Sequence, residues 1–366
     1  MAALLPAPTK APATSAPRIA VLMPAHNEAV GIAAVLAALK PQLREGDRLV
    51  VVADNCTDET AAIARQQGAI VIERHDPERR GKGYALDFGI RYLETAPPDV
   101  VVMMDADCIA QPGTIQHIAQ LATQHQRPVQ AVYLMEQPAQ PSPKSAVSAL
   151  AFLVKNLVRP TGLHRLDFPC LLTGTGMAFP WRVIQASPLA SGNLVEDMQL
   201  GLDLAIAGSP PLLCEDALVI GNLPQQAKAA TTQRTRWEHG HLKTLLTQVP
   251  ALLKAGIAQR RLDLVAIALD LAVPPLSLLV LLWAVCLALT AALVWQGATV
   301  LPLKLLLLQG GLLLGAIATA WAHFGRETIS PHQFAAIPLY IFWKIPLYLA
   351  FLVRPQTKWV RTQRDS

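Results

Sequence analysis

A long, nearly charge-free stretch near the end of the chain constrains its fold most. From Leu264 to Val353 the sequence holds only five charged residues, although the full 366 residues contain 31 Lys and Arg and 26 Asp and Glu. Segments of about 20 apolar residues cross a bilayer as helices. This region is therefore predicted to lie in a membrane, which excludes a purely cytosolic enzyme and a disordered chain.

Two segments of this region are predicted to span the membrane. Residues 276–295 and 300–324 are both long and apolar enough to cross it. Residues 334–353 contain two prolines, Lys344 and several aromatic residues, a composition typical of a membrane interface. We therefore expect an interfacial or broken helix at 334–353, within a membrane region that covers residues 256–353.

The distribution of basic residues predicts the topology. Two crossings return the chain to its starting side, so the basic tail, residues 354–366, lies with the soluble half. Basic segments favour the cytosolic side, and the sequence thus predicts an integral protein of a bacterial inner membrane with a cytosolic domain at 18–255. A further interfacial helix is expected at 262–272.

Cysteine content and net charge exclude other classes of protein. The five cysteines are scattered and form no C-x-x-C pair, so neither a disulfide framework nor a zinc site is indicated. The net charge of +5 does not call for nucleic acid, because basic residues beside a membrane pair with anionic lipid. Residues 1–17, with four prolines, are expected to form a flexible segment.

The soluble half alternates short apolar runs with helical patterns. Such alternation indicates βαβ units, and so an α/β domain with a Rossmann-like, mainly parallel sheet. Ligands bind beyond the carboxyl ends of the strands in these sheets. Strands are predicted at 19–24, 48–53, 69–73, 100–105 and 129–134, and helices at 29–39, 59–67, 83–93 and 114–124.

Three carboxylates are predicted at the ligand edge of this sheet. Asp54 follows the second strand, and Asp105 and Asp107 end the fourth. Two acids side by side are costly to bury unless they share a cation, and Mg²⁺ or Mn²⁺ held with substrate phosphates meets that need. Solvated acidic turns are the alternative. Asp58 is expected to cap the next helix in either case.

Further motifs allow two interpretations each. Lys82 between two glycines could approach a phosphate or form an exposed basic turn. Asp197, before a predicted helix, is either a general base or an N-cap. Gly174, Thr175 and Gly176 could admit an acceptor or form a tight turn. Gln233, Arg236 and Trp237 share one helical face that could bind a ligand or pack in the core.

Taken in order, these motifs resemble family 2 glycosyltransferases. They comprise Pro24-Ala25-His26-Asn27-Glu28, Asp54 to Asp58, Gly81-Lys82-Gly83, Asp105-x-Asp107, Glu196-Asp197 and Gln233-x-x-Arg236-Trp237. The set is similar to the membrane-integrated synthase branch, which contains cellulose, chitin and hyaluronan synthases and ceramide glucosyltransferase. The resemblance implies a GT-A catalytic domain followed by transmembrane and interfacial helices, a UDP-sugar donor and inversion at the anomeric carbon.

The resemblance also implies roles for individual residues. Asp197 is the expected catalytic base and Asp107 the expected ligand of Mg²⁺ or Mn²⁺. Donor or nucleotide contacts are expected from Pro24, Glu28, Asp54, Lys82, Asp105, Gln233 and Arg236, and acceptor contacts from Gly174, Thr175, Gly176, Glu196 and Trp237. Trp359, Arg361 and Thr362 in the tail loosely resemble a loop that closes over the nucleotide.

The function expected from the sequence is an inverting, metal-dependent hexosyl- or N-acetylhexosaminyltransferase at the cytosolic membrane face. Its acceptor would be a lipid-linked sugar or a polysaccharide, in glycolipid or exopolysaccharide synthesis. A processive synthase that works as a homo-oligomer or with other synthase subunits is one alternative. A catalytically silent, membrane-anchored subunit that only binds nucleotide sugar is another.

Overall fold

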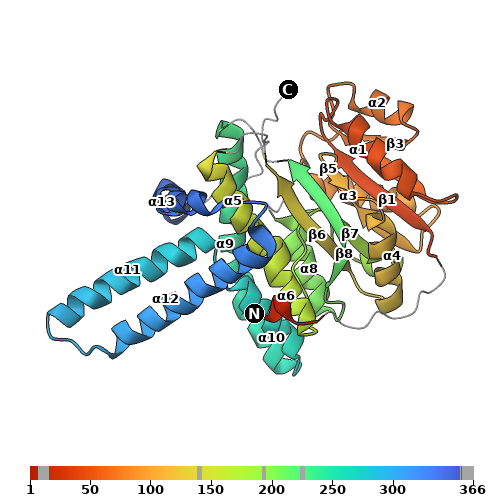
Figure 1. Ribbon diagram of the computed structural model, residues 1–366. Helices are drawn as coiled ribbons and strands as arrows, with labels where there is room; N and C mark the ends of the chain where they lie inside the picture. Colours follow the sequence, from red (N-terminus) through yellow and green to blue (C-terminus); the bar gives the residue numbers. More distant parts are fainter. Residues whose placement is uncertain (7–15, 138–141, 192–194, 223–226, 355, 357–366) are drawn as a thin grey trace.

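A mixed eight-stranded sheet forms the centre of the protein (Figure 1). The structure, a computed structural model, describes residues 1–6, 16–137, 142–191, 195–222, 227–354 and 356. The strand order is β3-β2-β1-β4-β7-β6-β8-β5. The strands are β1 (Ile19–Ala25), β2 (Arg48–Asp54), β3 (Ile70–Arg74), β4 (Val100–Met103), β5 (Cys108–Ala110), β6 (Val129–Glu136), β7 (Met177–Pro180) and β8 (Leu212–Asn222).

Most of the strand pairs are parallel, as the sequence predicts. β1 pairs in parallel with β2 and β4, β2 with β3, and β6 with β8. β7 runs antiparallel to both β4 and β6, and β5 runs antiparallel to β8. The α/β fold class is thus confirmed, and the carboxyl ends of β1, β2 and β4 meet at one edge of the sheet.

Three strands were not predicted, for identifiable reasons. β5 and β7 have only 3 and 4 residues, which is too short for a periodic pattern to show. β8 carries Glu215 and Asp216 within its apolar run, at a register shift in its pairing with β6. The five predicted strands and four predicted helices are all present, with bounds that shift by up to three residues.

Helices cover both faces of the sheet. One face packs on α1 (Ile32–Leu39), α2 (Thr60–Gln66) and α4 (Thr114–His125), and the other on α3 (Lys82–Leu93), α7 (Trp181–Ile184) and α8 (Glu196–Ile206). Alternate residues of β1 enter the two cores, so every residue from Ile19 to Met23 is buried. Each such aliphatic side chain contributes about 1.5–3 kcal/mol.

A second group of helices stands between the sheet and the long apolar helices that end the described chain (Figure 1). It contains α5 (Pro143–Leu153), a π-helical turn η3 (Val154–Val158), α6 (Arg159–Arg165), α9 (Ala227–Ala258) and α10 (Leu262–Leu271). Apolar residues of α8, α9 and α10 form one cluster. The predicted domain boundary at 255/256 falls inside α9, and α10 packs on α8 and α9.

Two long apolar helices form a hairpin that projects away from the sheet domain (Figure 1). They are α11 (Leu276–Trp295) and α12 (Leu301–Ala320). Trp283 of α11 donates a hydrogen bond to the carbonyl of Leu306 at 2.9 Å. A Cβ on Gly310 would lie 2.1 Å from the Trp283 ring, so glycine is required where the two helices meet. The hairpin is long and apolar enough to cross a membrane.

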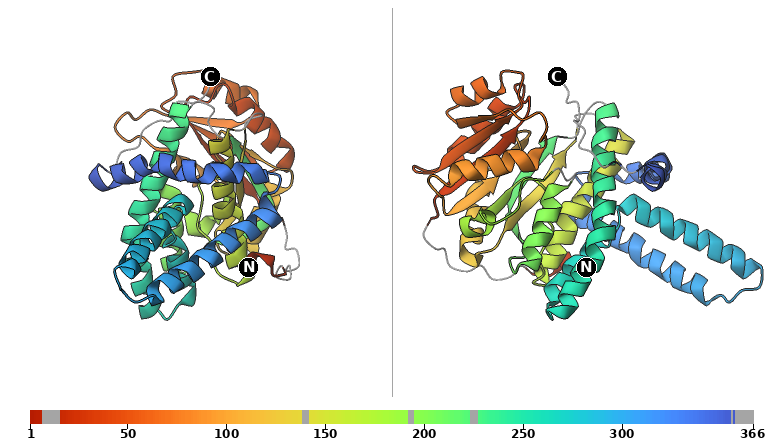
Figure 2. Two further views of the ribbon diagram at one scale, coloured as in Figure 1. Left: turned by 60° about the vertical axis from the view of Figure 1, so that its left-hand side comes forward. Right: turned by 180° about the vertical axis from the view of Figure 1, so that it is seen from behind.

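The last helix, α13 (Ile337–Val353), runs crosswise to this hairpin (Figures 1 and 2). It continues through Pro346, so the predicted break is absent, and with the preceding turn it too is long and apolar enough to span. One face is buried against the protein and carries Tyr340, Lys344 and Tyr348. The hydroxyl of Tyr348 hydrogen-bonds that of Ser277 at 2.6 Å, which ties α13 to the start of α11.

The first residues of the chain are anchored where a flexible segment was expected. Ala2–Leu4 form a 3₁₀ turn, and Ala3 is buried against α6. Arg165 of α6 donates to the carbonyl of Leu5. Met1, Leu4 and Leu5 stay exposed, so the docking depends on Ala3 and on the carbonyl of Leu5. This ordered turn stands where the sequence predicted a flexible segment. Residues 7–15 lie outside the described part of the chain.

Candidate active site

A cavity of about 1210 Å³ lies along the carboxyl ends of the strands. Pro24 and Asp54 line its far end, and Asp105 and Asp197 line its middle. At the other end the wall includes Ser277, where the first long apolar helix begins. The cavity therefore extends from the edge of the sheet to the start of the long apolar helix α11.

The loops after β1 and β2 are tied together at the far end. His26 Nδ1 donates to the carbonyl of Asp54 at 2.6 Å, and the side chain of Asn27 bonds both the amide and the hydroxyl of Thr57. Asp58, expected to cap α2, accepts from the amide of Thr60, the first residue of that helix, although Glu59 occupies the N-cap position. Pro24 and Glu28 line the cavity, as predicted.

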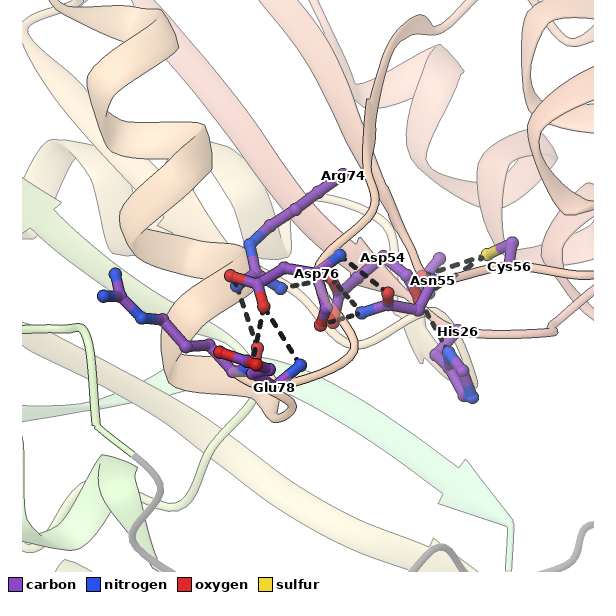
Figure 3. A network of polar contacts seen from close by, with 9 residues as sticks. His26, Asp54, Asn55, Cys56, Arg74, Asp76 and Glu78 are labelled. Atoms are coloured by element: carbon purple, nitrogen blue, oxygen red, sulfur yellow. Dashed lines mark hydrogen bonds and ion pairs between the residues drawn. The ribbon is translucent and has the colours of Figure 1, made fainter.

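Asp54 is buried and paired with a cation (Figure 3). Arg74, the last residue of β3, places Nη1 2.6 Å from Asp54 Oδ1, and its Nη2 reaches Asp76 Oδ2 at 3.0 Å. Burial raises the pKa of Asp54, and Arg74 opposes that shift. Sequence reasoning missed Arg74, although the parallel register pairs it directly with Asp54.

Replacing Arg74 with methionine is expected to lower the free energy of unfolding by about 3 kcal/mol, because a buried carboxylate loses its counter-charge. The loss should be smaller at pH 5 than at pH 8. Without Arg74 the raised pKa of Asp54 rises further, so the carboxyl group takes up a proton in the folded state as the pH falls. Denaturant titrations in mild detergent measure both values.

Arg65→Met is the matched control for this prediction. Arg65 of α2 pairs with Glu73, which precedes Arg74 on β3. The side chains of Arg65 and Glu73 are 51% and 43% exposed. Exposed pairs contribute about 0–1 kcal/mol. Equal destabilisation by the two substitutions would contradict the account of Asp54 and Arg74.

Lys82, Asp105 and Asp197 converge on Gly174 in the middle of the cavity. Lys82 Nζ forms an ion pair with Asp105 Oδ1 and donates to the carbonyl of Gly174 at 2.6 Å. A Cβ on Gly174 would lie 3.0 Å from Asp197 Oδ2 and 3.6 Å from Lys82 Nζ. Residues from α3, the turn after β4, α8 and the loop before β7 are therefore brought close to one another.

The electrostatics of this group favour a charged lysine. Burial opposes the charge of Lys82, but Asp105, Glu196 and Asp197 outweigh it and raise its pKa. Burial and the neighbouring Asp197 raise the pKa of Glu196 to about 7, while Lys82 opposes this shift. The lysine thus stays cationic and can stabilise an anionic group in the cavity.

The carboxylates of Asp105 and Asp107 are suited to a divalent cation. Ligand atoms of Asp105, Asp107 and Cys108 lie within 4.8 Å of one another. Cys108 is buried, and burial raises the pKa of its thiol far above the usual range, so the sulfur stays protonated. The oxygen ligands of Asp105 and Asp107 remain, and they suit Mg²⁺ or Mn²⁺. The predicted metal role therefore fits Asp107 and extends to Asp105.

The loop before β7 shows which of its residues can reach a ligand. Gly174 lines the cavity, but Thr175 is fully buried and its Oγ1 accepts from the amide of Asp105 at 3.1 Å. A Cβ on Gly176 would lie 2.7 Å from Val219. The predicted acceptor contacts of Thr175 and Gly176 are therefore corrected: these residues support Asp105 and allow close backbone packing.

Gly174→Ala is expected to lower kcat about tenfold, because the added methyl group displaces the Asp197 carboxylate by a few tenths of an ångström. Gly208→Ala is the control. Both glycines have positive φ, +95° and +100°, but a Cβ on Gly208 meets nothing within 4 Å. The two variants should lose similar stability, and only Gly174→Ala should lose activity; equal activity would contradict this geometry.

The predicted motif on α9 also faces the cavity. Gln233, Arg236 and Trp237 all line it. Trp237 packs on Phe152 with ring centroids 6.1 Å apart. The next residue, Glu238, forms a buried ion pair with Lys344 of α13. Sequence reasoning missed this pair, because its members are 106 residues apart and no local pattern links them.

The three tail residues lie outside the described part of the chain. Trp359, Arg361 and Thr362 belong to residues 357–366. Their predicted closure over the nucleotide stays a prediction.

Curated proteins match parts of this chain. Low-salt glycan biosynthesis hexosyltransferase Agl6 of Haloferax volcanii is 42% identical over 97 residues, 25% of this chain and 22% of that protein. An uncharacterized glycosyltransferase of Mycobacterium bovis is 33% identical over 122 residues, 31% of this chain and 51% of that protein. The matches thus span about a fifth to a half of the length of these curated relatives.

Solved structures and a family profile extend the comparison. The mannosyltransferase PcManGT of Pyrobaculum calidifontis, in complex with GDP-Man and Mn²⁺, is 21% identical, covers 97% of this chain and 92% of its own, and gives a TM-score of 0.56. This likeness concerns the fold, which is that of the GT-A glycosyltransferases. A profile of the family described as Glycosyltransferase like family 2 matches residues 17–240. The match covers more than half of the chain, which therefore belongs to that family.

Proposed function

We propose that the protein is an inverting, divalent-metal-dependent glycosyltransferase that moves a sugar from a UDP-sugar to a hydroxyl group of a membrane-borne acceptor. One observation carries the proposal: a single cavity contains the Asp105–Asp107 pair, Asp197 and the beginning of α11. The cavity thus holds the residues proposed to bind the donor and also borders the helix proposed to enter the membrane. The acceptor is accordingly a lipid-linked sugar or a growing glycan at the membrane surface.

At the donor end, different residues are proposed to bind the nucleotide and the diphosphate. Glu28 and Asp54 line the part of the cavity that takes the nucleotide, and Arg74 holds the Asp54 carboxylate in place. Asp105 and Asp107 would hold Mg²⁺ or Mn²⁺, which neutralises charge on a departing diphosphate. Lys82, held cationic beside Asp105, provides a second positive charge at the same place.

In this proposal Asp197 accepts the proton of the attacking hydroxyl group. It begins α8 together with Glu196, next to Lys82 and Gly174. Trp237 offers an apolar surface on the same side of the cavity as Gln233 and Arg236. General-base assistance of this kind is worth about 10²–10⁴ in rate.

The membrane arrangement supports a cytosolic catalytic domain. α11 and α12 supply two crossings, and the crosswise α13 with its buried polar face suits the interface. The basic tail then remains on the cytosolic side. A lipid-linked acceptor would enter where Val273 to Ser277 line the cavity.

A donor panel tests the proposal. Purified protein in mild detergent with Mn²⁺ and a bacterial lipid extract is incubated with UDP- and GDP-sugars, and nucleoside diphosphate release and product length are measured. Release from one UDP-sugar with a single added sugar is expected. Release from a GDP-sugar alone would overturn the donor assignment, and a ladder of products would favour a processive synthase. Binding without release would favour a silent subunit.

A further inference from the structure

Two polar side chains at the membrane end of the cavity have no partner among the residues that the structure describes. Lys155 and Asn156 are adjacent residues of η3, and both line the cavity. Asn156 is only 4% exposed, yet its amide makes no hydrogen bond within the described residues. The Lys155 ammonium likewise forms neither a hydrogen bond nor an ion pair there.

Neighbouring cations in the same wall are neutralised, and this distinguishes Lys155 from them. Arg159 pairs with Asp270 at 2.6 Å, and Lys344 pairs with Glu238. Lys155 is half-buried, and an ammonium group partly withdrawn from water without a counter-charge is costly for the folded state. An unpaired ammonium group of this kind is expected in a binding site, where an anionic ligand supplies the counter-charge.

The local backbone explains how two adjacent side chains reach one space. α5 continues into the five-residue π-helical turn η3 and then into α6. A π-helical turn changes the direction of side chains relative to a regular helix, and such turns occur often at functional sites. Within the described residues it places an ammonium group and an amide group side by side in the cavity wall.

The position of Lys155 relative to Asp197 indicates which substrate it serves. Burial lowers the pKa of Lys155, and among its neighbours Asp197 opposes that shift most, followed by Glu238 and Asp270. Lys82 by contrast is held by Asp105, at the metal end. Asp197 thus lies between two cations. Lys155 lies four residues before Arg159, whose partner Asp270 precedes the cavity-lining residues Val273 to Ser277. Lys155 therefore belongs to the wall next to the start of α11, where the acceptor would enter.

We propose that Lys155 and Asn156 bind a phosphate or phosphodiester group of the acceptor and thereby present its hydroxyl group to Asp197. An ammonium and an amide together offer several N–H donors to phosphate oxygens and supply the missing counter-charge. The inference rests on the proposed function, because it names the acceptor class of that same site. The phosphate is either part of a lipid headgroup or part of a soluble acceptor.

Binding measurements on the full chain in detergent test this without requiring turnover. UDP and Mg²⁺ are present at saturation, so that the donor end is filled. The probes are dihexanoyl phosphatidic acid, the neutral dihexanoylglycerol and glycerol 3-phosphate, titrated by calorimetry. We expect phosphatidic acid to bind at least tenfold more tightly than dihexanoylglycerol, and Lys155→Met and Asn156→Leu to remove at least tenfold of that affinity.

Lys254→Met is the matched control, because it removes an exposed lysine of α9 outside the cavity wall. It should bind all three probes like the wild type. Lys155→Met should not lower the melting temperature, because it removes an unpaired, half-buried charge, and so loss of binding cannot be ascribed to unfolding. UDP affinity should be the same in every variant.

The outcomes separate the sources of the phosphate and the two proposals. Phosphatidic acid binding much more tightly than glycerol 3-phosphate identifies a lipid headgroup. Equal binding identifies a soluble phosphate acceptor and would overturn the membrane-borne acceptor of the proposed function. Unchanged phosphatidic acid affinity in Lys155→Met, or no preference for phosphate over the neutral lipid, would overturn this inference while UDP binding remained. Absence of UDP binding would instead overturn the proposed function.

Discussion

Replacing Asp197 with asparagine lowers kcat by about 10³-fold and leaves donor affinity unchanged. The amide keeps the shape of the carboxylate but cannot accept a proton from the acceptor hydroxyl, and a positioned general base is worth about 10²–10⁴ in rate. Asp197 sits beside Lys82 and Gly174 at the start of α8. UDP release gives kcat, and calorimetry with UDP gives donor affinity.

Asp203→Asn is the control for this result. Asp203 lies on the same helix, is exposed, and accepts a hydrogen bond from Gln199 at 2.8 Å. Its replacement removes the same charge without touching the cavity, so activity should change by less than twofold. Wild-type turnover in Asp197→Asn would assign the proton to another group. Loss of UDP binding in that variant would mean that Asp197 acts on the donor instead.

The second large effect is expected from the metal-binding acids. Asp107→Asn should lower kcat/KM about 10²–10³-fold at low Mn²⁺, because one of two oxygen ligands loses its charge. Activity should recover in part as Mn²⁺ is raised, because the remaining Asp105 still binds weakly. Titrating Mn²⁺ against the initial rate of UDP release measures this shift.

Asp87→Asn separates the metal effect from a general loss of negative charge. Asp87 lies on α3 and pairs with Arg91 four residues later, away from the cavity. It should show the Mn²⁺ dependence of the wild type. A wild-type enzyme that keeps full activity in excess EDTA, or an Asp107→Asn variant with an unchanged Mn²⁺ midpoint, would contradict the metal role.

The fold and the order of the site were predictable because they depend on local patterns. Apolar runs of strand length and helical periodicity identify β1 to β4, β6 and the helices between them. The parallel arrangement then brings Asp54 and Asp105 to one edge. The 20 residues of α11 coincide with the predicted span, because a charge-free apolar run leaves little choice of bounds.

The partners of these residues could not be predicted, because they come from distant parts of the chain. Arg74 looks like an ordinary strand residue until the register places it beside Asp54. Lys155 lies in a helical segment whose π-helical turn leaves no distinctive sequence pattern. Thr175 shares its motif with Gly174, but burial gives the two residues different roles.

The most direct test of the central claim is transfer of label from donor to membrane. The protein is reconstituted in liposomes of bacterial lipid, a radiolabelled UDP-sugar and Mn²⁺ are supplied outside, and label in the organic extract is counted. The account predicts label in the lipid fraction with the wild type and none above background with Asp197→Asn. Label that stays in the aqueous phase for every donor, while UDP still binds, would contradict it.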